Sequence, residues 1–333
     1  MKAPDGIAHA YSAYTRKKTI LFLFFLVLLA AVALLALCVG SYRLMPLQII
    51  DSLLGRSGEA ASIVVWNIRA PRIMAAVIAG WGLALAGVVI QCILNNPLGS
   101  PFTLGISHGA AFGAAFAIVV LGEGAVRGSG DNAGVIANIA ASGIYSVTLF
   151  AFLGAVLATV VIIILARIRK MAPESIILSG VALSSLFVSG TILIQYFAED
   201  VEVASIVFWT FGDVGRASWG EILLMAAATV PATAWFFMHR WSFNALSAGE
   251  DAAKSLGVNV ERIRIWGMLG AAFLSALIVS FLGVIGFLGL VAPHMARRIV
   301  GEDHRFLVPH ACILDGQCTG LEDRPADRIR RQE

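Results

Sequence analysis

Residues 286–305 read GFLGLVAPHMARRIVGEDHR, and this stretch changes abruptly from apolar to basic. A run without charged residues meets Pro293 and His294 near its end, and Arg297 and Arg298 follow within one helical turn. Helices that leave a membrane have this pattern, because Lys and Arg concentrate just beyond the ends of spans on one side of the bilayer. The stretch therefore predicts that the chain spans a membrane.

The composition supports the same class. Hydrophobic residues make up 59% of the chain and charged residues only 14%, against about 25% charged residues in soluble domains. Runs without Asp, Glu, Lys or Arg cover residues 19–42, 73–122, 132–166, 175–198, 222–239 and 266–296. A helix needs about 20 residues to cross a bilayer, so the sequence predicts an all-α, polytopic integral membrane protein.

Two of these runs contain breaks that divide each of them into two predicted helices. NNPLGSP at 95–101 divides the run 73–122, because prolines and amide side chains favour a turn. Gly283, Gly286 and Gly289 interrupt the run 266–296. We expect a single transmembrane domain over residues 1–310 and a polar tail over 311–333. The predicted hydrophobic segments lie near 19–40, 72–94, 104–121, 144–166, 175–197, 219–238, 264–284 and 286–299.

Positive charges orient these segments. They cluster before the first segment, after the fourth, and between the sixth and seventh, and cytoplasmic loops are rich in such charges. We therefore expect a cytoplasmic N-terminus, with residues 123–132 and 198–205 on the opposite side. The clustered residues are Arg16, Lys17, Lys18, Arg167, Arg169, Lys170, Arg240, Lys254, Arg262 and Arg264.

Arg69 and Arg72 break this pattern, because they precede the second segment on the predicted outer side. Two interpretations remain. Arginine can pair bidentately with carboxylates of a docking partner, or its charged end can extend toward lipid headgroups.

The interiors of the segments contain no Asp, Glu, Lys or Arg, although ion-coupled carriers ordinarily use such groups within the membrane. Gly105, Gly109 and Gly113 recur every four residues, a spacing that favours close helix packing. Cys312 and Cys318 near His310 have too loose a spacing to predict a metal site. Ser184, Ser185 and Ser189 place hydroxyls in an uncharged segment, where they serve either packing or a transport pathway.

The loop 239–264 contains SAGEDAAKSLGVNV at 247–260. Ser247 and Glu250 have the spacing of a capping box, and Gly257 has the position of a C-terminal glycine. The pattern predicts a helix over 248–256 with a small apolar face of Ala248, Ala252, Ala253 and Leu256. From these residues alone the helix is either a solvated loop element or a docking surface.

Four motifs in order carry a resemblance to a known family: RAPR at 69–72, NNPLGSP followed by GIS at 105–107, GEDAAKSLGVNV at 249–260, and residues 286–305. The chain resembles the FecCD-type permeases, the membrane subunits of ATP-driven importers for iron-siderophore complexes, haem and cobalamin. The resemblance implies a type II importer permease with ten spans in the family, of which about eight are present here.

The resemblance also implies roles for particular residues. It places contacts with an ATPase in the loop 239–264, contacts with a substrate-binding protein at the RAPR motif, and the transport pathway on the segment at 175–197. The residues are Gly249, Glu250, Ala253, Leu256 and Gly257 for the ATPase, Arg69 and Arg72 for the binding protein, and Ser184, Ser185 and Ser189 for the pathway.

The chain has no G-x-x-x-x-G-K-[ST] phosphate loop. We therefore expect a transport subunit without enzymatic activity or cofactor of its own, with ATP and Mg²⁺ bound by a separate ATPase subunit. The other expected partners are a soluble substrate-binding protein, a second copy or a related permease, and membrane lipid, but no nucleic acid. The expected location is the prokaryotic cytoplasmic membrane, where the chain imports its cargo by alternating access.

The C-terminus departs from the family, which continues after the proline that matches Pro309 into two further spans. This chain instead continues as CILDGQCTGLEDRPADRIRRQE at 312–333, so we expect the last two spans to be missing and assembly to suffer. The alternatives are an ion-coupled secondary transporter and a non-functional truncated permease. Iron-siderophore is the commonest cargo in the family and is the expected one.

Overall fold

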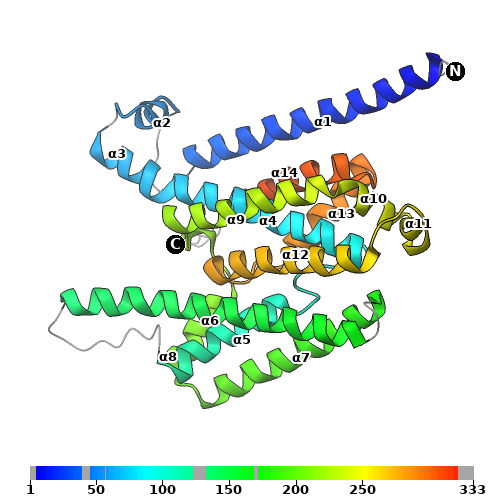
Figure 1. The fold of residues 1–333 in the computed structure, drawn as a ribbon. Coiled ribbons are helices and arrows are strands. Elements are labelled where there is room, and N and C mark those ends of the chain that lie inside the picture. The colour runs from blue at the N-terminus through cyan, green and yellow to red at the C-terminus, as the bar shows by residue number, and fades with distance from the viewer. Residues whose placement is uncertain (1–4, 40–45, 57, 123–132, 169–171, 322–333) are drawn as a thin grey trace, which may run out of the picture.

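The computed structural model describes residues 5–39, 46–56, 58–122, 133–168 and 172–321, and these ranges contain helices but no strand (Figure 1). The predicted all-α fold is confirmed. The helices are α1 Asp5–Cys38, α2 Pro46–Leu53, α3 Glu59–Ile63, η1 Val64–Arg69, α4 Ala70–Ile93, α5 Ile106–Val120, α6 Ala133–Ile168, α7 Pro173–Phe197, α8 Asp200–Thr210, η2 Val214–Arg216, α9 Trp219–Met238, α10 Arg240–Ser247, α11 Glu250–Ser255, α12 Val260–Leu282, α13 Leu288–Val300 and α14 His304–Leu321.

Among the described residues, six helices are long and apolar enough to cross a membrane. Each of the eight predicted hydrophobic segments contains a helix, but α5 and α13 are shorter than a full span. The candidate spans are Tyr11–Cys38, Glu59–Ile93, Tyr145–Ile168, Pro173–Phe197, Trp219–Met238 and Val260–Leu282.

Both predicted helix breaks are confirmed. After α4, Asn95 adopts a positive φ of 45°, and the Asn96 side-chain oxygen accepts a hydrogen bond from the Leu98 backbone N–H. Asparagine favours such turns because its short side chain can bond to the nearby backbone. At the second break α12 ends at Leu282, Gly283 takes a positive φ of 80°, and α13 begins at Leu288.

The helix α4 forms the centre of the bundle. In the most apolar window of the span Glu59–Ile93, 78% of the residues are buried, compared with 61% in Val260–Leu282 and none in Tyr11–Cys38. The helix contacts α12, α13, α14 and α9. The first span therefore lies at the periphery, whereas α4 and α12 form the core.

Glycines allow this central helix to approach its neighbours. A Cβ atom on Gly87 would lie 1.8 Å from the Gly289 carbonyl oxygen at the start of α13, and one on Gly80 would lie 2.8 Å from the backbone of Asp315 in α14. Lipid supplies little hydrophobic drive for association between helices, so small residues that bring backbones together stabilise the bundle.

The predicted packing role of the glycine stripe is confirmed at the contact between α5 and α6. A Cβ atom on Gly113 would lie 2.1 Å from the Phe150 carbonyl oxygen, and one on Gly109 would lie 2.6 Å from that of Gly154. Gly105 precedes α5 with a φ of 80° and lies against Ser184 of α7. Gly105, Gly109 and Gly113 thus allow α5 to pack closely against both α6 and α7.

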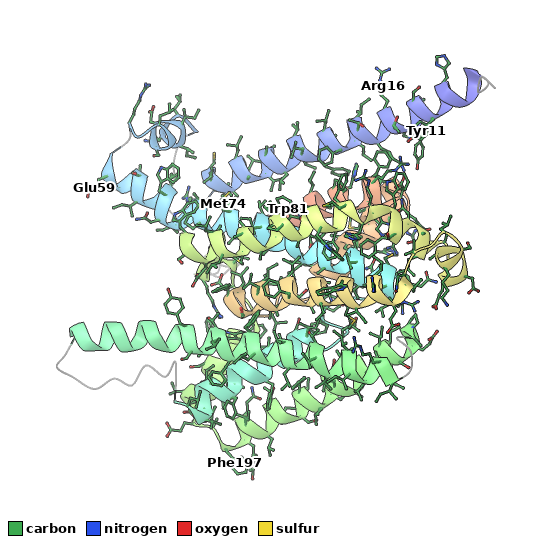
Figure 2. The ribbon with its side chains drawn as sticks, in the orientation of Figure 1. Tyr11, Arg16, Glu59, Met74, Trp81 and Phe197 are labelled. Carbon is green, nitrogen blue, oxygen red and sulfur yellow. The ribbon has the colours of Figure 1, made fainter. Side chains whose placement is uncertain are left out.

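Three segments that the charge pattern assigned to one side lie at the same end of the bundle. Figure 1 shows the N-terminal half of α1, the junction of α6 with α7, and α10–α11 at this end. Tyr11 and Arg16 lie there as well, far from Glu59 at the opposite end (Figure 2). The Arg305 side chain donates a hydrogen bond of 2.9 Å to the Tyr11 hydroxyl and so joins α14 to α1.

The helix α14 differs from the expected polar tail. It runs through the expected boundary at residue 310 and buries Ala311, Ile313, Leu314 and even Asp315 against the bundle. Its principal neighbours are α4, α13 and α1. The apolar run in this helix is short, because Asp315 and Gln317 interrupt it, and the small residue Gly316 lies at the contact with α4. Residues 322–333 of the expected tail lie outside the described ranges.

We predict that Gly113→Ala destabilises the protein, because the added methyl group would overlap the Phe150 carbonyl. Overpacking of this kind costs about 1–3 kcal/mol, and it should lower the midpoint temperature of unfolding in detergent. Gly286→Ala is the matched control, because a Cβ atom on Gly286 would have no neighbouring atom within 4 Å. Equal midpoints for the two variants would contradict the close contact of α5 with α6.

Candidate functional site

The segment α10–α11 connects two candidate spans and protrudes from one end of the bundle (Figure 1). Phe243 and Leu246 of α10 are buried, 1% and 4% exposed, and Phe243 stacks against the His304 ring at 5.9 Å. These contacts hold α10 on the bundle. The following helix α11 is therefore displayed on a fixed base.

The predicted helix over 248–256 is shorter than expected and begins differently. Gly249 has a φ of 115°, so it cannot continue α10, and α11 begins at Glu250. The predicted capping box is wrong, because Ser247 ends α10 and its hydroxyl donates to the Phe243 carbonyl at 3.1 Å. A serine forms this bond to the preceding turn as readily as it caps the next helix.

The predicted end of the helix is confirmed at Gly257. This glycine has a φ of 78°, its N–H donates to the Lys254 carbonyl, and the Val258 N–H donates to the Ala253 carbonyl. The two bonds form a Schellman motif, which terminates a helix through a residue in the left-handed conformation.

The five residues that the resemblance assigned to ATPase contact do not share one surface. Glu250, Leu256 and Gly257 are exposed, with Leu256 at 70%, and Gly249 is half-buried. Ala253 is fully buried, so its side chain anchors α11 to the bundle and is not part of the exposed surface. The apolar face of this six-residue helix is too narrow both to anchor α11 to the bundle and to contact a partner.

A salt bridge joins α11 to α12. The Glu250 carboxylate lies 2.8 Å from Lys254 Nζ and 3.0 Å from a terminal nitrogen of Arg264, whose side chain is only 6% exposed. The hydrogen bond from Lys254, with the charge of Arg264, lowers the pKa of Glu250. The bridge therefore stabilises the fold above the pKa of a free glutamate, and this contribution disappears as the pH falls through the lower pKa of the folded state.

The two arginines of the RAPR motif have different environments. Arg69 is 8% exposed, and its guanidinium donates to the Leu37 carbonyl of α1. In this conformation the Arg69 side chain fastens η1 to α1, and its contact with a docking partner stays a prediction. The position of Arg69 in the sequence could not show this burial.

Arg72 remains accessible at the end of the bundle opposite α11. Its side chain is 40% exposed and lies 4.0 Å from the Asp213 carboxylate, a distance at which exposed ion pairs contribute little stability. Nearby, Arg216 donates to the Phe208 carbonyl at 2.6 Å, and Trp219 donates to the Trp66 carbonyl. Together these groups form one polar surface. Arg72 is the only one of them that the sequence analysis predicted as part of a docking site.

The three serines of α7 are divided between two faces. Ser184 is half-buried against Gly105, and its hydroxyl donates to the Gly180 carbonyl at 2.8 Å. Ser185 and Ser189 are exposed on the outer face of the helix. Only these two serines can contact a neighbouring molecule, since Ser184 packs at the crossing of α5 and α7.

Arg264 is the main residue of this site that the sequence reasoning did not single out. It was counted only as one of several basic residues that orient the chain. Arg264 lies within the first turns of α12, a few residues after α11, and this position could have indicated a salt bridge to Glu250. No helical spacing relates the two residues in the sequence, because the chain turns at Gly257 between α11 and α12.

We predict that Glu250→Gln weakens the attachment of α11 to α12, because the neutral amide cannot hold both cations. Hydrogen exchange of the α11 amides should become up to about fivefold faster, which corresponds to the upper range for an exposed ion pair. Glu261→Gln is the control, since Glu261 is exposed at the same end of the bundle. Unchanged exchange in Glu250→Gln would show that packing of Ala253 alone holds α11.

Comparisons with known proteins agree with this architecture. A protein of Methanocaldococcus jannaschii named as an ABC transporter permease is 52% identical over 92% of this chain and 86% of its own length. The hemin transport system permease HmuU of Yersinia pestis is 31% identical over 92% of this chain and 86% of its own length. A solved inward-facing structure of a metal-chelate type ABC transporter matches with a TM-score of 0.77 and 28% identity, over 92% of this chain and 89% of that one. The family model of the FecCD transport family matches residues 27–320, and so includes most of α14. The chain belongs to the FecCD transport family of ABC permeases.

Proposed function

We propose that this chain is the membrane-spanning subunit of an ATP-driven importer that moves a metal chelate, such as an iron-siderophore complex, across the cytoplasmic membrane by alternating access. The observation that carries the proposal is the protruding helix α11, which is fastened to the core helix α12 by the bridge from Glu250 to Arg264. Such a connection suits the transfer of movement from a partner to the spans.

The mechanical step follows from the contacts. An ATPase subunit that binds the exposed part of α11 pulls on Glu250, and the bridge passes this force to Arg264 near the start of α12. Because α12 packs along α4 in the core, its displacement shifts the centre of the bundle. Ala253 holds α11 against the bundle during the movement, since its side chain is fully buried.

The same arrangement supports a proposal for the remaining partners. The chain lacks a phosphate loop, so ATP and Mg²⁺ belong to the ATPase subunit at the end with α11, which we place in the cytoplasm with the N-terminus. A soluble binding protein docks at the opposite end, near Arg72. A second permease subunit covers the outer face of α7, which presents Ser185 and Ser189 to the pathway between the two copies.

The class of cargo rests on relatives. HmuU is named for hemin transport, and the solved structure is titled as a metal-chelate type transporter. Both descriptions concern metal ions enclosed in an organic chelator. We therefore propose a metal chelate as the cargo, with an iron-siderophore complex as the first to test.

We predict that Leu256→Glu abolishes capture of the ATPase subunit when the affinity-tagged chain is purified from detergent. Leu256 is 70% exposed on the coupling segment, and a charge there would oppose burial in the ATPase surface. Leu54→Glu is the matched control, because Leu54 is 60% exposed at the opposite end of the bundle.

Transport assays separate this proposal from an ion-coupled carrier. In liposomes, the importer requires ATP and its ATPase subunit, and its cargo raises ATP turnover. Uptake by the chain alone under an ion gradient, with no ATPase captured by the unmodified chain, would overturn the proposal.

We predict that Arg72→Glu weakens binding of the soluble partner roughly tenfold or more, because a charge-assisted hydrogen bond contributes about 1.5–3 kcal/mol. Arg56→Glu reverses an exposed charge at the same end and should have a much smaller effect. Surface plasmon resonance with immobilised permease provides the measurement. Equal losses in both variants would indicate general electrostatic attraction rather than a specific contact.

A further inference from the structure

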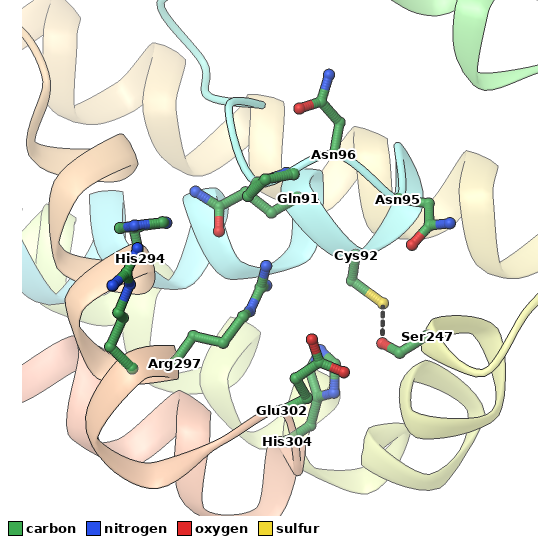
Figure 3. Close-up of a pocket in the computed structure, with 11 residues that line it drawn as sticks. Gln91, Cys92, Asn95, Asn96, Ser247, His294, Arg297, Glu302 and His304 are labelled. Carbon is green, nitrogen blue, oxygen red and sulfur yellow. Dashed lines mark hydrogen bonds between the residues drawn. The ribbon is translucent and has the colours of Figure 1, made fainter.

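A cavity of about 330 Å³ lies beside the coupling segment at the end of α4 (Figure 3). Its walls come from α4, the turn at 95–97, the end of α10, α13 and the start of α14. On one side, Cys92 lies 3.3 Å from the Ser247 hydroxyl and closes the wall between α4 and α10. The volume falls in the range of small-ligand sites, about 300–1,000 Å³.

Arginines give the cavity a positive charge. Arg297 and Arg298 contribute two positive charges, and the exposed Glu302 contributes one negative charge. Arg297 is half-buried, and its Nε is buried without a hydrogen-bond partner among the described residues. Figure 3 shows this side chain extending toward Gln91 on α4. A guanidinium in this position is ready to donate to an anion.

Gln91 supplies a buried acceptor. The residue is 1% exposed, and its side-chain nitrogen donates to the Leu290 carbonyl at 3.3 Å. This bond fixes the orientation of the amide, since the reverse orientation would oppose two oxygens. The side-chain oxygen is then left buried and without a partner among the described residues.

His304 supplies a second buried acceptor and is 2% exposed. The Asn244 side-chain nitrogen donates to Asp303, so the Asn244 oxygen is an acceptor, and it lies 2.9 Å from His304 Nδ1. Nδ1 therefore carries the proton. Burial and the charge of Arg297 lower the pKa of His304 to about 4, so the ring is neutral at pH 7 and the buried, unpartnered Nε2 is an acceptor.

A group that satisfies all these atoms must carry negative charge for the arginines and hydrogen-bond donors for Gln91 and His304. Buried polar atoms without a partner destabilise the fold, so a ligand that forms hydrogen bonds with them stabilises the protein on binding. The described residues offer no cluster of three His, Cys, Asp or Glu suited to a metal ion. An anion with hydroxyl groups has the required chemistry.

We propose that this cavity binds a phosphate group that carries hydroxyls. Its source is either a soluble phosphate or the glycerol phosphate headgroup of an anionic lipid, and basic pockets between helix ends are known to suit lipid headgroups. The proposal does not depend on the transport function, because it rests only on the atoms that line the cavity.

The test measures thermal unfolding of the full-length chain in detergent and phosphate-free buffer at pH 7. Inorganic phosphate, sulfate and chloride are titrated at matched ionic strength, and short-chain phosphatidylglycerol and phosphatidylcholine are compared separately. We expect stabilisation by phosphate or phosphatidylglycerol that exceeds that by sulfate or phosphatidylcholine, because the latter two carry no hydroxyl donor. A response to phosphate alone identifies a soluble ligand, and a response to phosphatidylglycerol alone identifies a lipid headgroup.

Two variants assign the effect to the cavity. Arg297→Gln should weaken the apparent affinity roughly 10- to 100-fold, the expected loss for a charge-assisted hydrogen bond, whereas Arg262→Gln, an exposed arginine at the same end, should not. Gln91→Leu should remove the preference for phosphate over sulfate. Equal stabilisation by all anions, an equal response in Arg262→Gln and Arg297→Gln, or no stabilisation of the unmodified chain would overturn the proposal.

Discussion

Close backbone packing around α4 is the constraint on which the other features of this protein depend. Gly87 leaves no room for a side chain against the Gly289 carbonyl, and Gly80 lies tight against α14. In a lipid environment, contact between helix surfaces replaces the hydrophobic effect as the main stabilising factor. The small residues of α4 therefore determine how closely α12, α13 and α14 can gather around it.

This packing brings chemically distinct groups to one end of the bundle. The ends of α4, α10 and α13 meet the start of α14 there, and α11 protrudes beside them. The bridge from Glu250 to Arg264 links the protruding helix to the core, while the cavity lined by Gln91 and Arg297 lies at its base. A partner that moves α11 would therefore act close to the cavity, and a ligand in the cavity would bear on the same helix ends.

The sequence predicted those features that depend on local geometry. Gly257 ends α11 because a left-handed residue is required there, and Asn95 and Asn96 form the turn after α4. It failed where several partners compete for one residue. Ser247 bonds to its own preceding turn rather than capping α11. The burial of Arg69 against α1 likewise could not be derived from its position in the sequence.

The sequence alone determined the membrane class, the segments that become helices, the grouping of the basic connections at one end of the bundle, and the membership of a permease family. These properties follow from hydropathy, charge and short motifs, which are local. The tertiary structure alone decided which helix is central, that α14 is buried, that Ser184 is separated from Ser185 and Ser189, and that Arg264 reaches Glu250. Each of these depends on contacts between residues distant in the chain, and the sequence pattern of a single helix does not specify its neighbour.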